Sequence, residues 1–194
     1  MRNCLQVAAS KYPDGTLAEN NTEQVLQYMI ERFRAWYEEE DIPAEVVKAV
    51  SAKNISRPLD IHRRVQAVHT FAQLPEAQAL AAANKRVSNI LGKLGSDHKF
   101  GSVSANLLLE PQEKALALQL DALAATCDEH LKKDEYADAL SCLASLREPV
   151  DAFFDGVMVN VDEETLRNNR LNLLKQLRDL FLQVADVSLL VVSK

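Results

Sequence analysis

The sequence predicts an all-α protein, a helical bundle of about seven or eight helices. Hydrophobic residues make up 47% of the 194 positions, which is enough apolar material for one packed core. Only five glycines and six prolines are present, whereas an all-β or Rossmann-type chain needs glycine at many tight turns. Apolar residues also recur every three or four positions along most of the chain, which is the spacing of a buried helix face.

The first predicted helix covers residues 22–40. Thr22 can cap its start, and Glu23 places a negative charge in the first turn, where the helix dipole favours one. Four apolar residues at spacings of four, four and three form a stripe that we expect to face the core. These residues are Val25, Met29, Phe33 and Trp36.

Three further helices are expected before the middle of the chain, at 43–52, 58–73 and 76–94. Pro43 suits a first helical turn, and Pro58 and Pro75 mark the restarts. Gly95 is expected to end the third of them, ahead of a polar loop over 96–104. The apolar positions expected to face the core are Ile61, Val65, Val68, Ala72, Leu80, Ala83, Val87, Ile90 and Leu94.

The second half of the chain predicts four more helices. Pro111 opens a long one, a charged break at 132–134 separates it from a helix over 136–146, and Pro149 begins a short segment. The last helix is expected to cover 162–187. Its inward residues are predicted to be Leu166, Leu173, Leu177, Phe181 and Val184.

Composition excludes several classes of protein. No run of about 18 apolar residues could span a membrane, and the N-terminus lacks the apolar stretch of a signal peptide. The three cysteines, in no CxxC spacing, predict reduced thiols in a cytoplasmic protein, and the four scattered histidines predict no metal site. Net charge is −6, but residues 53–99 carry eight basic and three acidic residues, so an RNA backbone could bind there. Chance clustering on solvated helix faces would give the same pattern.

Two long stretches carry a pattern beyond periodicity, residues 81–91 (AAANKRVSNIL) and residues 149–159 (PVDAFFDGVMV), the second continuing as LRNNRL at 166–171. Both resemble the DALR-type anticodon-binding domain that ends the bacterial glycyl-tRNA synthetase beta subunit. The resemblance covers roughly residues 24–190. Shorter stretches that also match are 33–37, 56–60 and 184–190.

This resemblance implies a non-catalytic part of an ATP-dependent glycine–tRNA ligase. ATP, Mg²⁺ and glycine would be bound by a separate alpha subunit, so no cofactor and no catalytic residue is expected in this chain. The implied partners are tRNA-Gly, the alpha subunit and the upstream part of the beta subunit in a heterotetramer. Residues 22–194 would form the anticodon-binding domain, and residues 1–21 the tail of a preceding region or an introduced start. The alternative is a helical protein–protein or subunit-assembly module without direct RNA contact.

The helix expected at 76–94 offers the best candidate surface for tRNA. At 100° per residue, four polar side chains fall on one face, opposite or beside the core positions. These are Lys85, Arg86, Asn89 and Lys93. Arginine and lysine can pair with phosphates, and asparagine can read unpaired bases. Arg63 and Arg64 could join this surface or form a solvated pair.

Arg170 is the most conspicuous residue of the second stretch, but the helical wheel turns it toward the apolar face. A buried guanidinium needs a carboxylate, so we expect a structural ion pair with Asp151 or Asp155. The pair Phe153 and Phe154 could stack on bases, although filling the core is the commoner role of such a pair.

Overall fold

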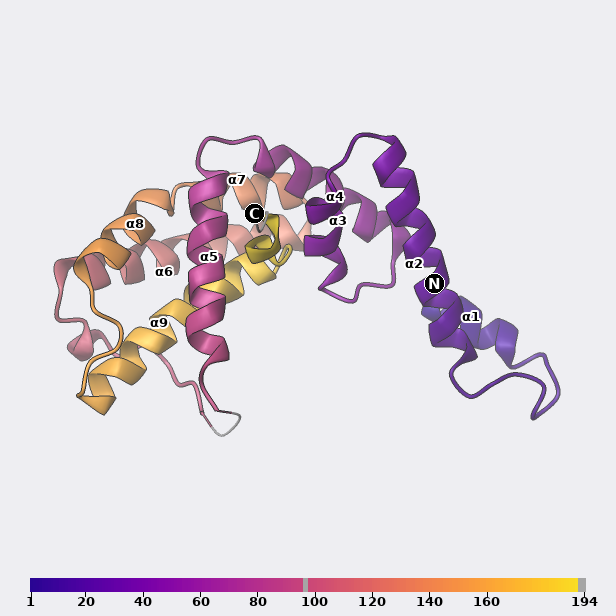
Figure 1. Ribbon diagram of the computed structural model, residues 1–194, viewed down its shortest axis with the longest axis horizontal. Helices are drawn as coiled ribbons and strands as arrows, with labels where there is room; N and C mark the ends of the chain where they lie inside the picture. Colours follow the sequence, from indigo (N-terminus) through magenta and orange to yellow (C-terminus); the bar gives the residue numbers. More distant parts are fainter. Residues whose placement is uncertain (96–97, 192–194) are drawn as a thin grey trace.

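The computed structural model describes residues 1–95 and 98–191, and its described residues form nine α-helices, two short 3₁₀ helices and no strand (Figure 1). This confirms the predicted all-α fold. The α-helices are α1 (Arg2–Ala9), α2 (Asn21–Glu39), α3 (Ala44–Ser51), α4 (Pro58–Ala72), α5 (Ala77–Gly92), α6 (Pro111–Lys132), α7 (Tyr136–Ala144), α8 (Arg147–Gly156) and α9 (Glu164–Leu182). The 3₁₀ helices are η1 (Ala105–Leu107) and η2 (Val187–Leu190).

Eight of these helices correspond to predicted ones, and α1 is the addition. It lies within residues 1–21 and buries none of its residues. It packs on α2, and the Arg2 guanidinium donates to both carboxylate oxygens of Glu23 at 2.8 and 2.9 Å. Its eight residues are too few to show a long periodic stripe, so it could not be predicted from apolar spacing.

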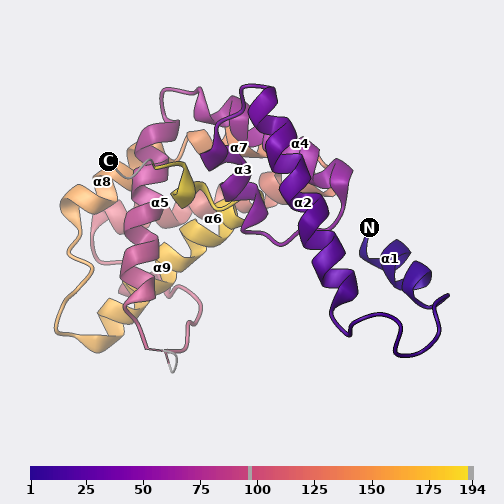
Figure 2. The same cartoon turned by 45° about the vertical axis from the view of Figure 1, so that its right-hand side comes forward.

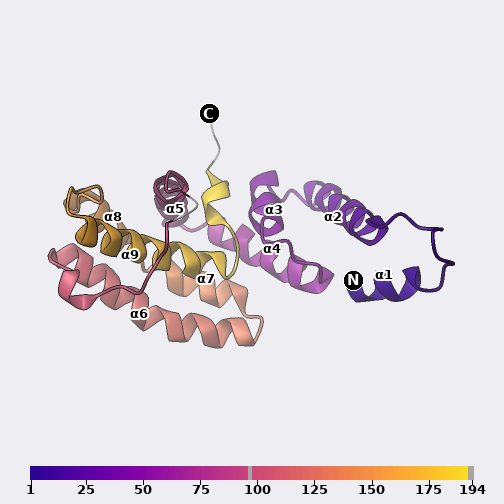
Figure 3. The same ribbon diagram turned by 90° about the horizontal axis from the view of Figure 1, so that it is seen from below.

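The helices divide into a bundle and an arm. Helices α5 to α9 form the bundle at one end of the molecule, and α1 and α2 project at the other, with α3 and α4 between them (Figures 1 and 3). Helix α4 packs against α7, and α6 packs against α7, α8 and α9. Helix α5 contacts α8 and α9 and crosses the layer that they form (Figure 3).

The segment after α9 joins the bundle to α3. Helix α9 ends at Leu182, five residues before the predicted end, and η2 then lies against both α3 and α5 (Figure 2). The Asp186 N–H donates to the Ala49 carbonyl at 3.0 Å, and Val187 is buried. Residues far apart in the sequence therefore share one core.

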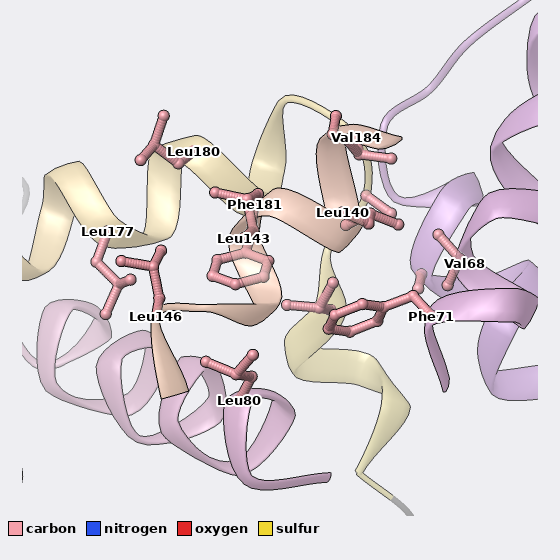
Figure 4. Close-up of a cluster of buried hydrophobic side chains, with 14 of the residues drawn as sticks. Val68, Phe71, Leu80, Leu140, Leu143, Leu146, Leu177, Leu180, Phe181 and Val184 are labelled. Atoms are coloured by element: carbon pink, nitrogen blue, oxygen red, sulfur yellow. The ribbon is translucent and has the colours of Figure 1, made fainter. Parts of the chain in front are cut away.

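Figure 4 shows the centre of this core, where α4, α5, α7 and α9 meet. The rings of Phe71 and Phe181 lie 6.3 Å apart, with leucines of α7 and α9 around them. Each such side chain contributes roughly 1.5–3 kcal/mol on burial. All five inward positions predicted for the last helix are buried. On α4 one of the four predicted inward positions is wrong: Ala72 is exposed, and its neighbour Phe71 is buried instead.

Helix α9 also fixes the loop between α5 and α6. Helix α5 ends at Gly92, three residues before the expected stop, and residues 98–104 have no regular structure, while Ser96 and Asp97 of the predicted loop lie outside the described residues. Asn169 accepts from the Ser104 N–H at 2.7 Å and donates to the Ser104 carbonyl at 3.1 Å. Asn172 accepts from the Gly101 N–H at 3.0 Å.

The stripe predicted for the first helix is not the face that α2 buries. Leu26 and Tyr37 are buried, whereas Val25, Met29 and Trp36 are exposed, so the expectation that Trp36 belongs to the core is wrong. Apolar residues cover more than one face of α2, which packs against both α1 and α3. Spacing alone could not say which part of so wide an arc is covered.

Candidate nucleic-acid interface

Helix α5 presents its predicted polar face to solvent. Leu80, Val87 and Leu91 turn inward, and the four candidate side chains of Lys85, Arg86, Asn89 and Lys93 are all exposed. At 1.5 Å per residue, Lys85 and Lys93 are about 12 Å apart along the axis. The face is therefore long enough to follow more than one phosphate of a nucleic-acid backbone.

Arg86 does not extend freely from this face. Its guanidinium carbon lies 4.2 Å from the ring centroid of Phe154, a cation–π contact between α5 and α8. Such a contact holds the guanidinium plane while leaving its N–H groups able to donate. Stacking against the ring thus preorganises Arg86 for an anionic or planar ligand.

The two phenylalanines of the second stretch have different places. Phe153 is fully buried, whereas Phe154 is only partly buried and meets it edge to face at 5.6 Å. The expectation that the pair fills the core holds for Phe153 alone. The sequence did not show which of the two would reach the surface, because adjacent residues on a helix differ by 100° and either one could have faced inward.

Arg86 and Phe154 belong to the walls of a groove of about 770 Å³. One wall comes from α5 and the other from the end of α8 and the segment 157–160, so the stretches 81–91 and 149–159 meet here. In the described part of the chain, neither Lys85, Arg86 nor Lys93 forms an ion pair. The lining residues are Arg86, Ile90, Lys93, Leu94, Phe154, Asp155, Gly156, Val157, Met158, Val159, Asn160 and Leu171.

Arg170 supports the second wall from within. It is 4% exposed, its Nη1 donates to the Met158 carbonyl at 2.7 Å, and its Nε donates to Glu113 Oε1 at 2.6 Å. The other Glu113 oxygen accepts from the N–H groups of Leu109 and Glu110 at 2.8 and 2.7 Å. One buried ion pair therefore connects α9, the start of α6 and the groove.

The partner of Arg170 differs from the one that we expected from the sequence. Arg170 is in a buried ion pair, but neither Asp151 nor Asp155 takes part. Both aspartates are exposed, and Asp151 lies 3.8 Å from Arg147 one turn earlier on α8. Glu113 is 57 residues away in sequence, and only the packing of α6 on α9 brings it near.

Comparison with known protein families matches residues 80–187 to the DALR anticodon binding domain. The chain belongs to the DALR anticodon binding domain family. The matched range begins in α5 and ends in η2, and it contains both walls of the groove. The family resemblance read from residues 81–91 and 149–159 is thus confirmed.

Three relatives of this DALR domain protein carry the same name. The chain is 56% identical over 175 residues to a protein of Marinobacter nauticus named glycine–tRNA ligase beta subunit, an alignment that covers 90% of the chain and 25% of that protein. Proteins of the same name from Histophilus somni and Vibrio vulnificus are 46% and 48% identical, over 94% and 91% of the chain and 26% of each relative. The chain spans about a quarter of the length of these curated relatives.

Arg64 has a structural role in the fold and is largely buried. Arg64 Nε donates to Asp60 at 2.8 Å, and Nη1 donates to the carbonyls of Gln183 and Val184 at 2.7 Å each. The guanidinium also lies 4.0 Å over the Tyr136 ring. It therefore supplies hydrogen-bond donors to two carbonyls at the end of α9. Because only 12% of its side chain is exposed, Arg64 does not belong to the candidate surface.

Arg63 lies beside it but remains exposed. Its Nη1 donates to Asp134 at 2.8 Å, in a pair that is open to solvent on both sides. An exposed pair of this kind is worth about 0–1 kcal/mol, so a phosphate could displace the aspartate. Arg63 stays a prediction as a nucleic-acid contact.

Asp60 is the centre of the polar network around Arg64. It accepts from the Tyr136 hydroxyl at 2.6 Å as well as from Arg64. Burial alone would raise the pKa of Asp60, but the hydrogen bonds from Tyr136 and Arg64 and the nearby positive charges outweigh it and lower the pKa. Burial, together with the carboxylates of Asp60 and Asp134, raises the pKa of Tyr136.

Other chemistry-bearing groups of the DALR domain have structural explanations. Ligand atoms of His130, Glu135 and Asp138 lie within 4.8 Å of one another, but the two carboxylates are at the start of α7, where a helix dipole favours negative charge. Burial raises the pKa of the Cys127 thiol to about 11, so a thiolate nucleophile is disfavoured there. None of the described helices is both long enough and apolar enough to cross a membrane.

Proposed function

We propose that this chain binds the anticodon stem-loop of tRNA-Gly as part of a glycine–tRNA ligase. The family to which residues 80–187 belong, and the name that its relatives share, support this assignment. The binding surface would be the exposed face of α5 together with the groove between α5 and α8. Its residues would be Lys85, Arg86, Asn89, Lys93 and Phe154. Arg63, on α4, would be a further contact outside the groove.

The observation that carries the proposal is the stacking of Arg86 on Phe154 at 4.2 Å. Anticodon loops hold unpaired bases that proteins recognise by stacking on aromatic rings or guanidinium planes. The guanidinium plane of Arg86, held over the Phe154 ring, offers such a surface. The partly buried Phe154 ring packs edge to face against the fully buried Phe153, which anchors it to the core.

The surrounding side chains fit the rest of a loop. Lys85 and Lys93 supply positive charge on either side of Arg86 for the phosphate backbone. The Asn89 amide offers two donors and one acceptor to a base edge. The groove wall at Met158 and Asn160 would limit which base enters, and Arg170 fixes that wall through the Met158 carbonyl.

In the whole ligase, we propose that this domain grips tRNA so that its acceptor end reaches the alpha subunit. Glycine, ATP and Mg²⁺ would be bound by that subunit, in a heterotetramer of alpha and beta subunits. The role assigned to the present residues is recognition and orientation of tRNA. Substrate positioning of this kind accelerates a reaction without any catalytic group in the positioning domain.

A footprint of the chain on tRNA-Gly tests the proposal. We expect protection of anticodon-loop nucleotides from nuclease or chemical cleavage, with the acceptor stem unprotected. Loss of that protection as salt rises would match the charged contacts. Protection of the acceptor stem alone, or no protection at low salt, would overturn the assignment.

A further inference from the structure

Helix α2 carries a row of apolar side chains that the described part of the chain covers only in part. Four of its apolar side chains are exposed, Tyr28 by 56%, Trp36 by 42%, and Val25 and Met29 by 36% each. Val25, Met29 and Trp36 lie within about 40° of one another around the helix axis, and Tyr28 lies next to them. Scattered exposed apolar residues are ordinary, whereas an aligned row of them marks an interaction surface.

The row is about 16 Å long, because Val25 and Trp36 are eleven residues apart at 1.5 Å each. Near its middle, the Arg32 guanidinium donates to the Tyr28 hydroxyl at 3.0–3.1 Å and lies 5.1 Å from the ring. The exposed aromatic ring is thus held in a defined orientation. We call this row, Val25, Tyr28, Met29 and Trp36, the α2 stripe.

The α2 stripe ends at an aromatic ring surrounded by acids. The Trp36 indole stacks on the His62 ring at 5.7 Å, which fixes one of its faces. Glu39 and Glu40, three and four residues later, flank it on neighbouring sides of the helix, and both are exposed. The C-terminal carbonyls of α2 add negative potential at the same end. Such a site attracts a lysine or arginine side chain by charge and by cation–π contact.

The charge around the α2 stripe selects among possible occupants. Residues 12–45 contain nine acidic and two basic residues, a net charge of −7, although the whole chain carries only −6. An RNA backbone or an anionic membrane would be repelled. A second copy bound through the same stripe would bring two such segments together, at an electrostatic cost.

We propose that α2 docks a protein surface that is apolar along its centre and basic at its border. This surface would lie along the α2 stripe, with a lysine or arginine seated between Trp36, Glu39 and Glu40. The proposal does not depend on the tRNA-binding role, because the groove between α5 and α8 has a different charge and lies at the other end of the fold (Figure 1). One end of the domain would hold RNA and the other end protein.

Trp36 is the only tryptophan of the chain, so its fluorescence reports on the stripe directly. The probes are two helical peptides with the same leucine face, one bordered by lysine and the other by glutamate. Each is titrated into the whole chain, with acrylamide quenching and emission wavelength recorded. The stripe variant is Met29→Ser, and its matched control is Leu118→Ser, which removes an apolar side chain that is 73% exposed on α6.

The proposal predicts that the lysine-bordered peptide shifts Trp36 emission to the blue and protects it from acrylamide. The glutamate-bordered peptide should bind at least tenfold more weakly. Met29→Ser should weaken binding about tenfold, and Leu118→Ser should leave it unchanged. Equal binding of the two peptides, equal loss in the two variants, or concentration-dependent dimerisation of the chain in sedimentation would each overturn the proposal.

Discussion

Arg170 Nε lies 2.6 Å from Glu113 Oε1, and this buried contact joins the second turn of α9 to the first turn of α6. Glu113 also accepts two N–H groups ahead of α6, and Arg170 also donates to the Met158 carbonyl in the groove wall. The pair therefore connects the stability of the bundle with the shape of the candidate site.

Removing one partner should destabilise the domain strongly. Arg170→Met leaves the Glu113 carboxylate buried without its cation, and such losses cost about 3–5 kcal/mol. Denaturant unfolding followed by circular dichroism measures the change. Arg147→Met, which breaks the exposed contact with Asp151, is the control and should cost less than about 1 kcal/mol. Similar costs for the two variants would contradict the structural role of Arg170.

The two phenylalanines should separate stability from binding. Phe153→Ala empties a fully buried site and should cost about 3–5 kcal/mol of unfolding free energy. Phe154→Ala should cost less stability but reduce tRNA affinity, because base stacking on an aromatic ring is worth about 1–3 kcal/mol. Unfolding curves and filter binding of tRNA-Gly give the two quantities. A stable Phe154→Ala protein with unchanged affinity would remove Phe154 from the site.

Asn169 should control the order of the loop before α6. Asn169→Ala removes two hydrogen bonds to the backbone of the exposed Ser104, each worth about 0.5–1.5 kcal/mol. Hydrogen exchange should show faster exchange of the Ser104 amide. Asn172→Ala provides the comparison, since its loss should affect Gly101 first. Unchanged exchange at Ser104 would show that the loop is held by other contacts.

Asp60 should make stability depend on acid. Its pKa in the folded chain is below the ordinary value of 3.8, so its contribution is complete above that pH and is lost as pH falls through the folded pKa. The free energy of unfolding should therefore fall as the pH drops below 3.8 and through the folded pKa. Asp60→Asn should flatten this slope, and Tyr136→Phe should flatten it partly. An Asp60→Asn protein with the original slope would refute this assignment.

Long periodic segments were predictable because their apolar spacing matches the face that they bury. Helix α9 is the clearest case, with every predicted inward residue buried. Helix α2 shows the limit, since spacing describes an apolar arc but not which neighbour covers it, and Trp36 is exposed as a result. Helix α1, with eight residues and no buried side chain, leaves almost no periodic signal.

The candidate site was predictable in part for the same reason. The exposed face of α5 followed from its own periodicity, and so did the inward direction of Arg170. Contacts between distant residues did not follow. Three contacts leave no sign in the sequence near either residue. They are the pairing of Arg170 with Glu113, the capping of α9 by Arg64 and the stacking of Arg86 on Phe154.

A matched charge reversal shows whether the exposed face of α5 binds tRNA. The double variant Lys85→Glu and Arg86→Glu is compared with Lys132→Glu and Lys133→Glu, an equal change of charge at the exposed end of α6. Affinity for tRNA-Gly is measured by filter binding over a series of salt concentrations.

The α5 variant should bind at least about tenfold more weakly, with a shallower dependence of affinity on salt, because phosphate contacts are lost. The α6 variant should remain close to the unmodified chain. Equal weakening by both variants would mean that only net charge matters, and unchanged binding by the α5 variant would show that this face of α5 does not bind tRNA.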